Sequence, residues 1–284
     1  MRPLELLYEV DGLAHAELPA ALAALYPGAL GFEEPRLFAN FVTTVDGVVA
    51  IPSVPGSNKL IAAASESDRF VMGLLRACAD ALVIGSGTLA ASPRGVWTAE
   101  QAYPGASEAY AELRRLLGRE PELEVVVLSA SGAVDPDHPA FAAGAIVLTT
   151  DEGAAALDGS LPAASVLSVG PGPRLDVAAA VELLRSRGRG LILSEGGPHV
   201  LGSLLEAGLV DELFLTLSPL LVGRRGGDDR LALVEGADLL PGGPAGARLL
   251  SVRREAGHLF LRYELDRSRD QATAASASSI QSVR

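Results

Sequence analysis

The sequence predicts an α/β fold: a single domain with a mostly parallel central sheet, an antiparallel C-terminal edge and helices on both faces. Short apolar strands alternate with amphipathic helices along most of the chain, which is the pattern of a parallel sheet. The chain then closes on two apolar segments, 249–254 and 258–265, which flank Ala256-Gly257 and predict an antiparallel hairpin. No linker rich in Pro, Gly or Ser divides the 284 residues, so we expect one domain.

Residues 1–36 precede this pattern and predict an N-terminal extension packed on the main domain, which we expect to span 37–266. Within the extension, 18–25 predicts a short helix that ends at Tyr26-Pro27-Gly28. Residues 267–284 are rich in Ser, Ala and Gln and predict a disordered tail.

The first strand of the domain is expected over 38–49, where Asp46-Gly47 interrupts an apolar run, and a loop follows over 51–58. A helix is expected over 67–78, because apolar residues recur there at the spacing of one helical face. A short buried strand over 80–85 comes next. The other expected strands are 125–128, 145–149, 166–169, 191–194 and 213–217, and the other expected helices are 107–117, 176–187 and 198–207.

The chain is acidic, with a formal net charge of −12 and a pI of about 4.8. Sequence-independent binding to DNA or RNA phosphates needs a basic surface, so we expect no nucleic-acid partner. A small anionic ligand remains compatible with this charge, because local amides and a few arginines can outweigh it.

The cysteine content and the apolar runs bear on the cellular compartment. Cys78 is the only cysteine, so no intrachain disulfide can form, and we expect it to pack on an apolar helical face. The first residues carry acids early and lack the apolar core of a signal peptide. No stretch of about 18 uncharged apolar residues predicts a membrane span. We therefore expect a cytoplasmic protein in a reducing environment, with no membrane partner.

Two expected strand-to-helix turns carry glycines: Gly85-Ser86-Gly87-Thr88 and Glu195-Gly196-Gly197-Pro198-His199. Glycines let a ligand approach the backbone, and the free amides of a helix start attract phosphate. Ligands of parallel sheets gather at the carboxyl ends of strands, which would explain a carboxylate such as Glu195 at the end of an apolar strand. A tight turn without a ligand explains each motif equally well, and neither matches the dinucleotide-binding or P-loop pattern.

Several segments, taken in chain order, carry a resemblance to a known family. They are TVDG at 44–47, LRA at 75–77 running into DALVIGSGT at 80–88, EGGP at 195–198, GLVDEL at 208–213 and PLLVG at 219–223. Over 38–265 the chain resembles the reductase domain of riboflavin biosynthesis, the dihydrofolate-reductase-like C-terminal domain of bifunctional deaminase-reductases. The resemblance implies a dihydrofolate-reductase-like single domain, a homodimer and an NADPH-dependent oxidoreductase.

The resemblance also implies a reaction and a cofactor site. The ribosyl group of 5-amino-6-(5-phosphoribosylamino)uracil would be reduced to ribityl by hydride transfer from the nicotinamide C4 of NADPH. Ser129, or Ser131, follows the strand next to the first glycine turn and would meet the 2′-phosphate. The expected cofactor-binding residues are Val42, Leu60, Gly85, Gly87, Thr88, Ser129, Gly196, Gly197, Pro198, His199, Val200, Leu201 and Ser203.

On the substrate side, Arg76 matches an arginine that holds the substrate phosphate, and Asn58 aligns near a polar residue with the same task. Glu195 matches the substrate-binding glutamate. The family continues from its threonine into two acids, a proline and an arginine, whereas this chain has Ala91-Ser92-Pro93-Arg94. Arg94 is therefore the expected substitute for the substrate arginine, and Val48 stands where the family has a basic residue.

The reduction also needs a proton on the substrate nitrogen or oxygen. Asp46, Glu195 or an ordered water can supply it, so we name Asp46 and Glu195 as candidate catalytic residues. A turn aspartate is the alternative interpretation of Asp46, and a solvated helix residue is the alternative for Arg76.

Two rival functions stay open at this point. The same scaffold suits dihydrofolate or another pterin-like ring, and a non-catalytic NADPH-binding module is compatible with the missing acids at 91–92. A zinc deaminase is excluded, because one cysteine cannot supply its ligand motif. We expect no metal, since the four histidines lack metal-ligand spacing. They are His15, His138, His199 and His258.

Overall fold

The computed structural model describes residues 1–54, 56–162, 165–227, 229–240 and 244–266. The segment 267–284, for which we expected disorder, lies outside these residues. The strands are β1 (Glu5–Glu9), β2 (Arg36–Thr44), β3 (Val48–Ala50), β4 (Ala81–Gly85), β5 (Glu124–Leu128), β6 (Ile146–Thr149), β7 (Val166–Ser168), β8 (Leu191–Ser194), β9 (Glu212–Ser218), β10 (Leu231–Ala232), β11 (Ala247–Glu255) and β12 (His258–Leu265).

The helices are of two kinds, a few long ones and several single turns. The longer helices are α3 (Glu66–Cys78), α6 (Ser107–Leu116), α9 (Val177–Ser186) and α10 (Pro198–Glu206). The short ones are α1 (Ala20–Ala23), α2 (Ser57–Ile61), α4 (Ser86–Ala91), α5 (Ala99–Ala102), η1 (Pro104–Ala106), α7 (Pro139–Ala142) and α8 (Asp151–Ala156).

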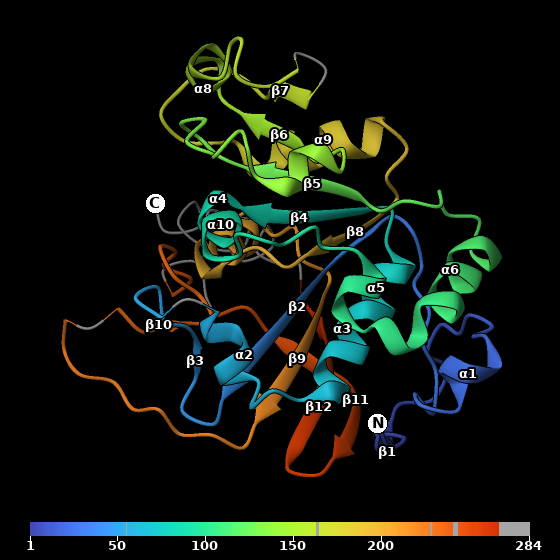
Figure 1. Cartoon of the computed structure of the whole chain (residues 1–284). Helices are drawn as coiled ribbons and strands as arrows, with labels where there is room; N and C mark the ends of the chain where they lie inside the picture. The colour runs from blue at the N-terminus through green and yellow to red at the C-terminus, as the bar shows by residue number, and fades with distance from the viewer. Residues whose placement is uncertain (55, 163–164, 228, 241–243, 267–284) are drawn as a thin grey trace, which may run out of the picture.

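A single 10-stranded sheet runs through the molecule in the order β1-β11-β12-β9-β2-β8-β4-β5-β6-β7 (Figure 1). The seven strands from β9 to β7 pair in parallel, as the alternation of strands and helices predicted. We call the edge where β2, β4, β8 and β9 end the carboxyl edge, and the opposite edge, where β4, β5 and β8 begin, the amino edge. The predicted α/β class is confirmed.

The C-terminal hairpin is also confirmed, since β11 and β12 pair antiparallel around Ala256-Gly257 and β12 pairs antiparallel with β9. It does not form the edge of the sheet, because β1 adds a further antiparallel strand to β11. The sequence did not predict β1. Most residues of β1 are exposed, so the strand lacks the alternation of buried and exposed residues that marks a half-buried strand.

The extension of residues 1–36 is fastened to the sheet by Arg253 of β11, which is 1% exposed. Its guanidinium donates to Glu9 at 2.9 Å and to the carbonyl of Pro27 at 2.8 Å. It also lies 3.9 Å from the centre of the Tyr26 ring, a cation–π contact. The N-terminal extension and β11 therefore pack against each other, although the division into extension and domain stays a prediction.

Apolar cores lie on both faces of the sheet, as the sequence predicted. One core contains Phe70 and Leu74 of α3 together with residues of α1 and α6, and Cys78 is buried in it. The other contains residues of α9 and α10, such as Val181 and Leu204. No helix of the described residues is long and apolar enough to cross a membrane.

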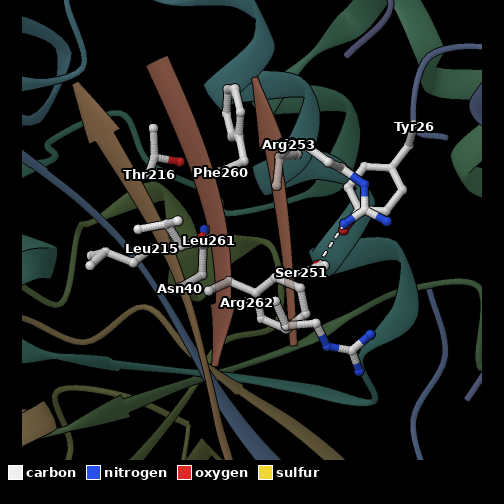
Figure 2. A pocket seen from close by; sticks show the side chains of 11 residues that line it. Tyr26, Asn40, Leu215, Thr216, Ser251, Arg253, Phe260, Leu261 and Arg262 are labelled. Carbon is white, nitrogen blue, oxygen red and sulfur yellow. Dashed lines mark hydrogen bonds between the residues drawn. The ribbon is translucent and has the colours of Figure 1, made fainter. Parts of the chain in front are cut away.

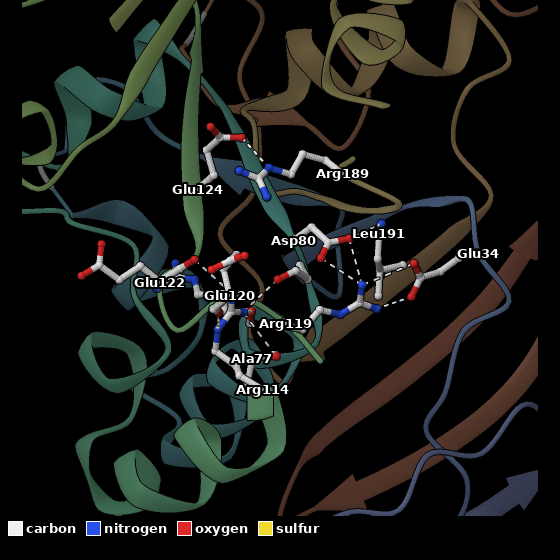
Figure 3. A network of polar contacts seen from close by, with 12 residues as sticks. Glu34, Ala77, Asp80, Arg114, Arg119, Glu120, Glu122, Glu124, Arg189 and Leu191 are labelled. Carbon is white, nitrogen blue, oxygen red and sulfur yellow. Dashed lines mark hydrogen bonds and ion pairs between the residues drawn. The ribbon is translucent and has the colours of Figure 1, made fainter. Parts of the chain in front are cut away.

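The amino edge is closed by arginines that bind backbone carbonyls and carboxylates (Figure 3). Arg114 of α6 is 5% exposed and donates to six carbonyls, three of them at the C-terminal end of α3. Arg119 bridges Glu34 and Asp80, and Asp80 also accepts the amide of Leu191 at 2.8 Å. These contacts fix α3 and the beginnings of β4 and β8 relative to one another.

Candidate active site at the carboxyl edge of the sheet

The two glycine turns lie side by side at the carboxyl edge. β4 and β8 are parallel neighbours, and the amide of Glu195 still donates to the carbonyl of Val83 at 3.0 Å. A Cβ atom on Gly197 would lie 3.3 Å from the Thr88 hydroxyl, so the turns are in contact. The N-cap residues of α4 and α10, Gly85 and Gly197, provide no side-chain hydrogen bond to the helix start.

The glycines of these turns serve two different purposes. A Cβ on Gly85 would come within 2.9 Å of Val200, and one on Gly196 within 2.6 Å, so the packing of Val200 explains both. Gly87 differs, because it is exposed and nothing lies within 4 Å of the position its Cβ would take. Protein packing does not explain Gly87, so this position has room for a ligand.

The remaining expected cofactor residues of α10 divide between its surface and the core. His199 and Ser203 are exposed on the helix surface, where the Ser203 hydroxyl donates to the His199 carbonyl at 3.0 Å. Leu201 is 1% exposed and packs in the core, so only its backbone is free to contact a ligand. Pro198, the first residue of the helix, is also buried.

The other expected cofactor residues lie on neighbouring strands. Val42 is half-buried on β2 and packs with Val48 and Ile61. Leu60 of α2 is 53% exposed and lines an open hollow of about 390 Å³. Ser129 is 3% exposed at the end of β5, so it offers a 2′-phosphate much less surface than the exposed Ser131.

Arg76 and Glu195 form a buried ion pair, although they are separated by 119 residues. The Arg76 Nη2 lies 2.6 Å from Oε2 of Glu195, and Nε donates to both carboxylate oxygens. The third guanidinium nitrogen donates to the Thr98 carbonyl at 3.0 Å. The interpretation of Arg76 as a solvated helix residue is therefore wrong. Its expected contact with a substrate phosphate stays a prediction, whereas its contact with Glu195 orients that carboxylate.

Asp46 is exposed and anchors a neighbouring segment. Thr44 donates its hydroxyl to Asp46 at 2.6 Å, and the amide of Gly223 donates at 2.6 Å. These hydrogen bonds, that of Thr44 first, lower the pKa of the Asp46 carboxyl. A carboxyl with a lowered pKa is ionised at neutral pH and holds no proton to donate. The geometry thus favours the turn interpretation of Asp46, and its catalytic role stays a prediction.

The two other expected substrate residues point to solvent. Asn58 is exposed, and its side-chain oxygen accepts the amide of Lys59 at 2.9 Å. Arg94 is exposed as well, and its carbonyl accepts from Gln101 at 2.9 Å. Neither is held in contact with Glu195, so their substrate contacts also stay predictions.

Asp68, a buried acid on α3, was not predicted from the sequence. The residue is 6% exposed, and burial raises the pKa of its carboxyl to about 6. An acid in the first turn of a helix is normally solvated. The signal that identifies Asp68 is its register, because it precedes Val71 by three residues and Leu75 by seven, on the apolar face of the helix.

No group of three or more His, Cys, Asp or Glu side chains within the described segments is arranged to hold a metal ion. His138 and His258 instead contact backbone carbonyls, those of Ser92 at 3.0 Å and Ala62 at 3.1 Å. The expected absence of a metal stays a prediction.

Comparison with known proteins identifies the family. The model of the RibD C-terminal domain matches residues 35–237, which is more than half of the chain. The protein therefore belongs to the RibD C-terminal domain family, and the family resemblance predicted from the sequence motifs is confirmed.

Individual relatives agree with this assignment. The 2,5-diamino-6-ribosylamino-4(3H)-pyrimidinone 5′-phosphate reductase of Archaeoglobus fulgidus is 28% identical over 199 residues, which cover 67% of this chain and 83% of the relative. A pyrimidine reductase-like protein from Corynebacterium diphtheriae shares the fold with a TM-score of 0.61 at 22% identity, over 82% of this chain and 92% of that one. RibD from Acinetobacter baumannii also has a TM-score of 0.61, at 17% identity, over 82% of this chain and 58% of that one.

Proposed function

We propose that the protein is an NADPH-dependent reductase of riboflavin biosynthesis. Its substrate would be a pyrimidine ribosylamine phosphate, either 5-amino-6-(5-phosphoribosylamino)uracil or the 2,5-diaminopyrimidinone named in the archaeal relative. The observation that carries the proposal is the carboxyl edge, where two glycine turns meet beside the buried carboxylate of Glu195. Membership of the RibD C-terminal domain family supports the substrate class.

The fit of a dinucleotide rests on the two glycine turns. Gly87 borders open space, and Gly197 starts a helix that has no side-chain cap. The amides of an uncapped helix start attract anions, so this turn can bind a pyrophosphate despite the acidic net charge. Thr88, in contact with Gly197, adds a hydroxyl donor beside it. Bound there, NADPH would supply a hydride from its nicotinamide C4.

The substrate side of the site rests on Glu195. Its carboxylate is held by Arg76 and follows directly after β8, at the same edge as the glycine turns. It can accept hydrogen bonds from ring N–H groups or from ribosyl hydroxyls. Because Arg76 fixes its orientation, Glu195 needs little reorganisation when the substrate binds.

NADPH oxidation by the purified protein tests this function. We expect turnover with at least one of the two pyrimidine ribosylamine phosphates and none with dihydrofolate. Turnover with dihydrofolate alone would assign the chain to the rival pterin-like reductases. Tight NADPH binding without oxidation by any of the three substrates would identify a non-catalytic module.

We also propose that the protein is a cytoplasmic homodimer. The family resemblance implies the dimer, and the mean hydropathy of +0.30 is high for a chain that exposes its whole surface to water. Light scattering at micromolar concentration should give twice the mass of the 29.2 kDa chain, and a monomer would reject the dimer.

A further inference from the structure

Residues 92–98 connect the first glycine turn with the buried ion pair of the site, and we call them the strap. They begin directly after α4, the helix that starts in this turn, and they end directly before α5. The last residue of the strap is Thr98, whose carbonyl accepts the Arg76 guanidinium at 3.0 Å. A displacement of the strap therefore changes a contact of the arginine that orients Glu195.

The backbone of Arg76 is fixed by contacts that do not involve the strap. Its carbonyl accepts the guanidinium of Arg114 at 3.2 Å. On the sheet side α3 leaves little free space, because the cavity to which Val71 contributes has a volume of only about 10 Å³, room for about one water molecule (Figure 2). What can still be adjusted is the end of the Arg76 side chain, which lies between Glu195 and the Thr98 carbonyl.

The strap is held by the side-chain amide of Gln101, a residue of α5. Its oxygen accepts the backbone amides of Val96 and Trp97, each at 2.9 Å, and its nitrogen donates to the Arg94 carbonyl at 2.9 Å. The backbone amide of Gln101 also donates to the Thr98 hydroxyl at 3.2 Å. One side chain thus binds three backbone groups of a segment that belongs to no helix or strand.

Trp97 shows why the strap depends on such contacts. Its φ is +53°, a left-handed backbone conformation that residues with a side chain rarely adopt and that persists only where the surroundings fix it. Its side chain is buried, and a Cβ on Gly95 would lie 2.7 Å from the indole ring. The ring centre lies 5.8 Å from that of His138. Packing thus fixes the Trp97 side chain, while Gln101 fixes its amide, one residue before the Thr98 carbonyl.

We propose that Gln101 is a positioning residue of the reductase, which holds the strap in the conformation that places the Thr98 carbonyl against Arg76. Arg76 in turn presents the Glu195 carboxylate to the substrate. This inference rests on the proposed reductase function. Gln101 acts through the other residues and needs no contact with substrate or cofactor, because a misplacement of about 1 Å that originates far from the chemistry can lower a rate about hundredfold.

The test compares Gln101→Met with Glu100→Met, a substitution of the neighbouring exposed residue of α5, in the full-length protein. Gln101→Met keeps a side chain of similar length but loses the three hydrogen bonds, so kcat/KM with the pyrimidine substrate should fall about ten- to hundredfold. We expect this loss mainly as a raised KM, because Glu195 binds the substrate. NADPH affinity, measured by calorimetry, should stay near the wild-type value, and Glu100→Met should behave as the wild type.

A double-mutant cycle with Glu195→Gln separates positioning from stability. If Gln101 acts through Glu195, Gln101→Met should lower kcat/KM by less than about threefold in the Glu195→Gln background, because the carboxylate that it positions is already lost. Gln101→Asn provides a second variant, which keeps the amide on a shorter side chain and perturbs the fold less. It should give a smaller loss with the same lack of additivity, so the cycle can be measured even if Gln101→Met does not fold.

The inference is overturned if the folded Gln101 variants keep the kcat/KM of the wild type, or if their losses are equally large in the Glu195→Gln background. A loss in which kcat, NADPH affinity and melting temperature fall together would assign Gln101 a structural role and overturn it as well. A wild type that binds NADPH but turns over neither pyrimidine would instead reject the proposed function, and the inference with it.

Discussion

The two edges of the parallel sheet are built on different principles. At the amino edge, Arg114 and Arg119 bind carbonyls and carboxylates around the beginnings of the strands. At the carboxyl edge, Gly87 borders open space and α10 starts without a side-chain cap. At the amino edge the arginines bind groups of the protein itself and stabilise the fold, whereas the carboxyl edge leaves the amides of a helix start available for a ligand.

The largest effect is a loss of stability, expected when the arginine contacts of the amino edge are removed. Arg114→Met removes the donors of six buried or half-buried carbonyls, and its free energy of unfolding should fall by about 3–5 kcal/mol. Urea denaturation measures the loss. The neighbouring exposed residue gives the control, since Arg115→Met should change stability by less than about 0.5 kcal/mol. Equal values for the two variants would contradict a structural role for Arg114.

The next largest effect is a gain in stability, expected when Asp68 is replaced by Asn above pH 6. The folded-state pKa of about 6 exceeds the unfolded value of 3.8, so the folded protein binds the Asp68 proton more tightly. The resulting stability is complete below pH 3.8 and is lost as the pH rises through about 6. Asp68→Asn removes this loss, which amounts to about 3 kcal/mol for about two pKa units. The melting temperature of the variant, relative to the wild type, should therefore rise between pH 4 and pH 8. A constant difference over that range would show that Asp68 does not titrate there.

A smaller effect is expected from Glu195→Gln, measured as kcat/KM with the pyrimidine substrate. Losing a charge-assisted hydrogen bond costs about 1.5–3 kcal/mol, so the loss should be roughly ten- to hundredfold. NADPH affinity should stay near that of the wild type, because the glycine turns are unchanged. Circular dichroism at the assay temperature checks that the variant is folded, since the change also alters the partner of the buried Arg76. Weakened NADPH binding with unchanged turnover would move Glu195 to the cofactor side.

The smallest effect is a slight change in melting temperature, expected for Asp46→Asn. Its lowered pKa means that it stabilises the fold as a carboxylate, and this contribution is lost as the pH falls below the ordinary value of 3.8. Asp46→Asn should therefore lower the melting temperature slightly at pH 7 and not at all in strong acid. A difference that persists in acid would show that the charge of Asp46 is not the cause.

The strands and turns that carry the site could be predicted from the sequence, whereas the contacts between its side chains could not. Apolar periodicity located the strands of the parallel sheet, and glycines at strand ends located both turns, because these signals are local. The pairing of Arg76 with Glu195 spans 119 residues, and no local pattern states which charges meet. β1 was not predicted for two reasons. It pairs with β11, which lies far along the chain, and most of its side chains are exposed. Asp68 was missed because acids in first helical turns usually face water.

The most direct test of the carboxyl edge as the ligand site is NADPH titration by calorimetry of the wild type, Gly87→Val and Ala111→Val. Gly87 has nothing within 4 Å of its Cβ position, so the substitution meets no protein atom nearby and projects into the proposed site. Ala111 is exposed on α6 and provides the same residue type on a different helix. We predict that the wild type and Ala111→Val bind NADPH alike and that Gly87→Val binds at least tenfold more weakly, a loss of about 1.4 kcal/mol. Equal affinities for all three folded proteins, or no binding by the wild type, would contradict this location of the site.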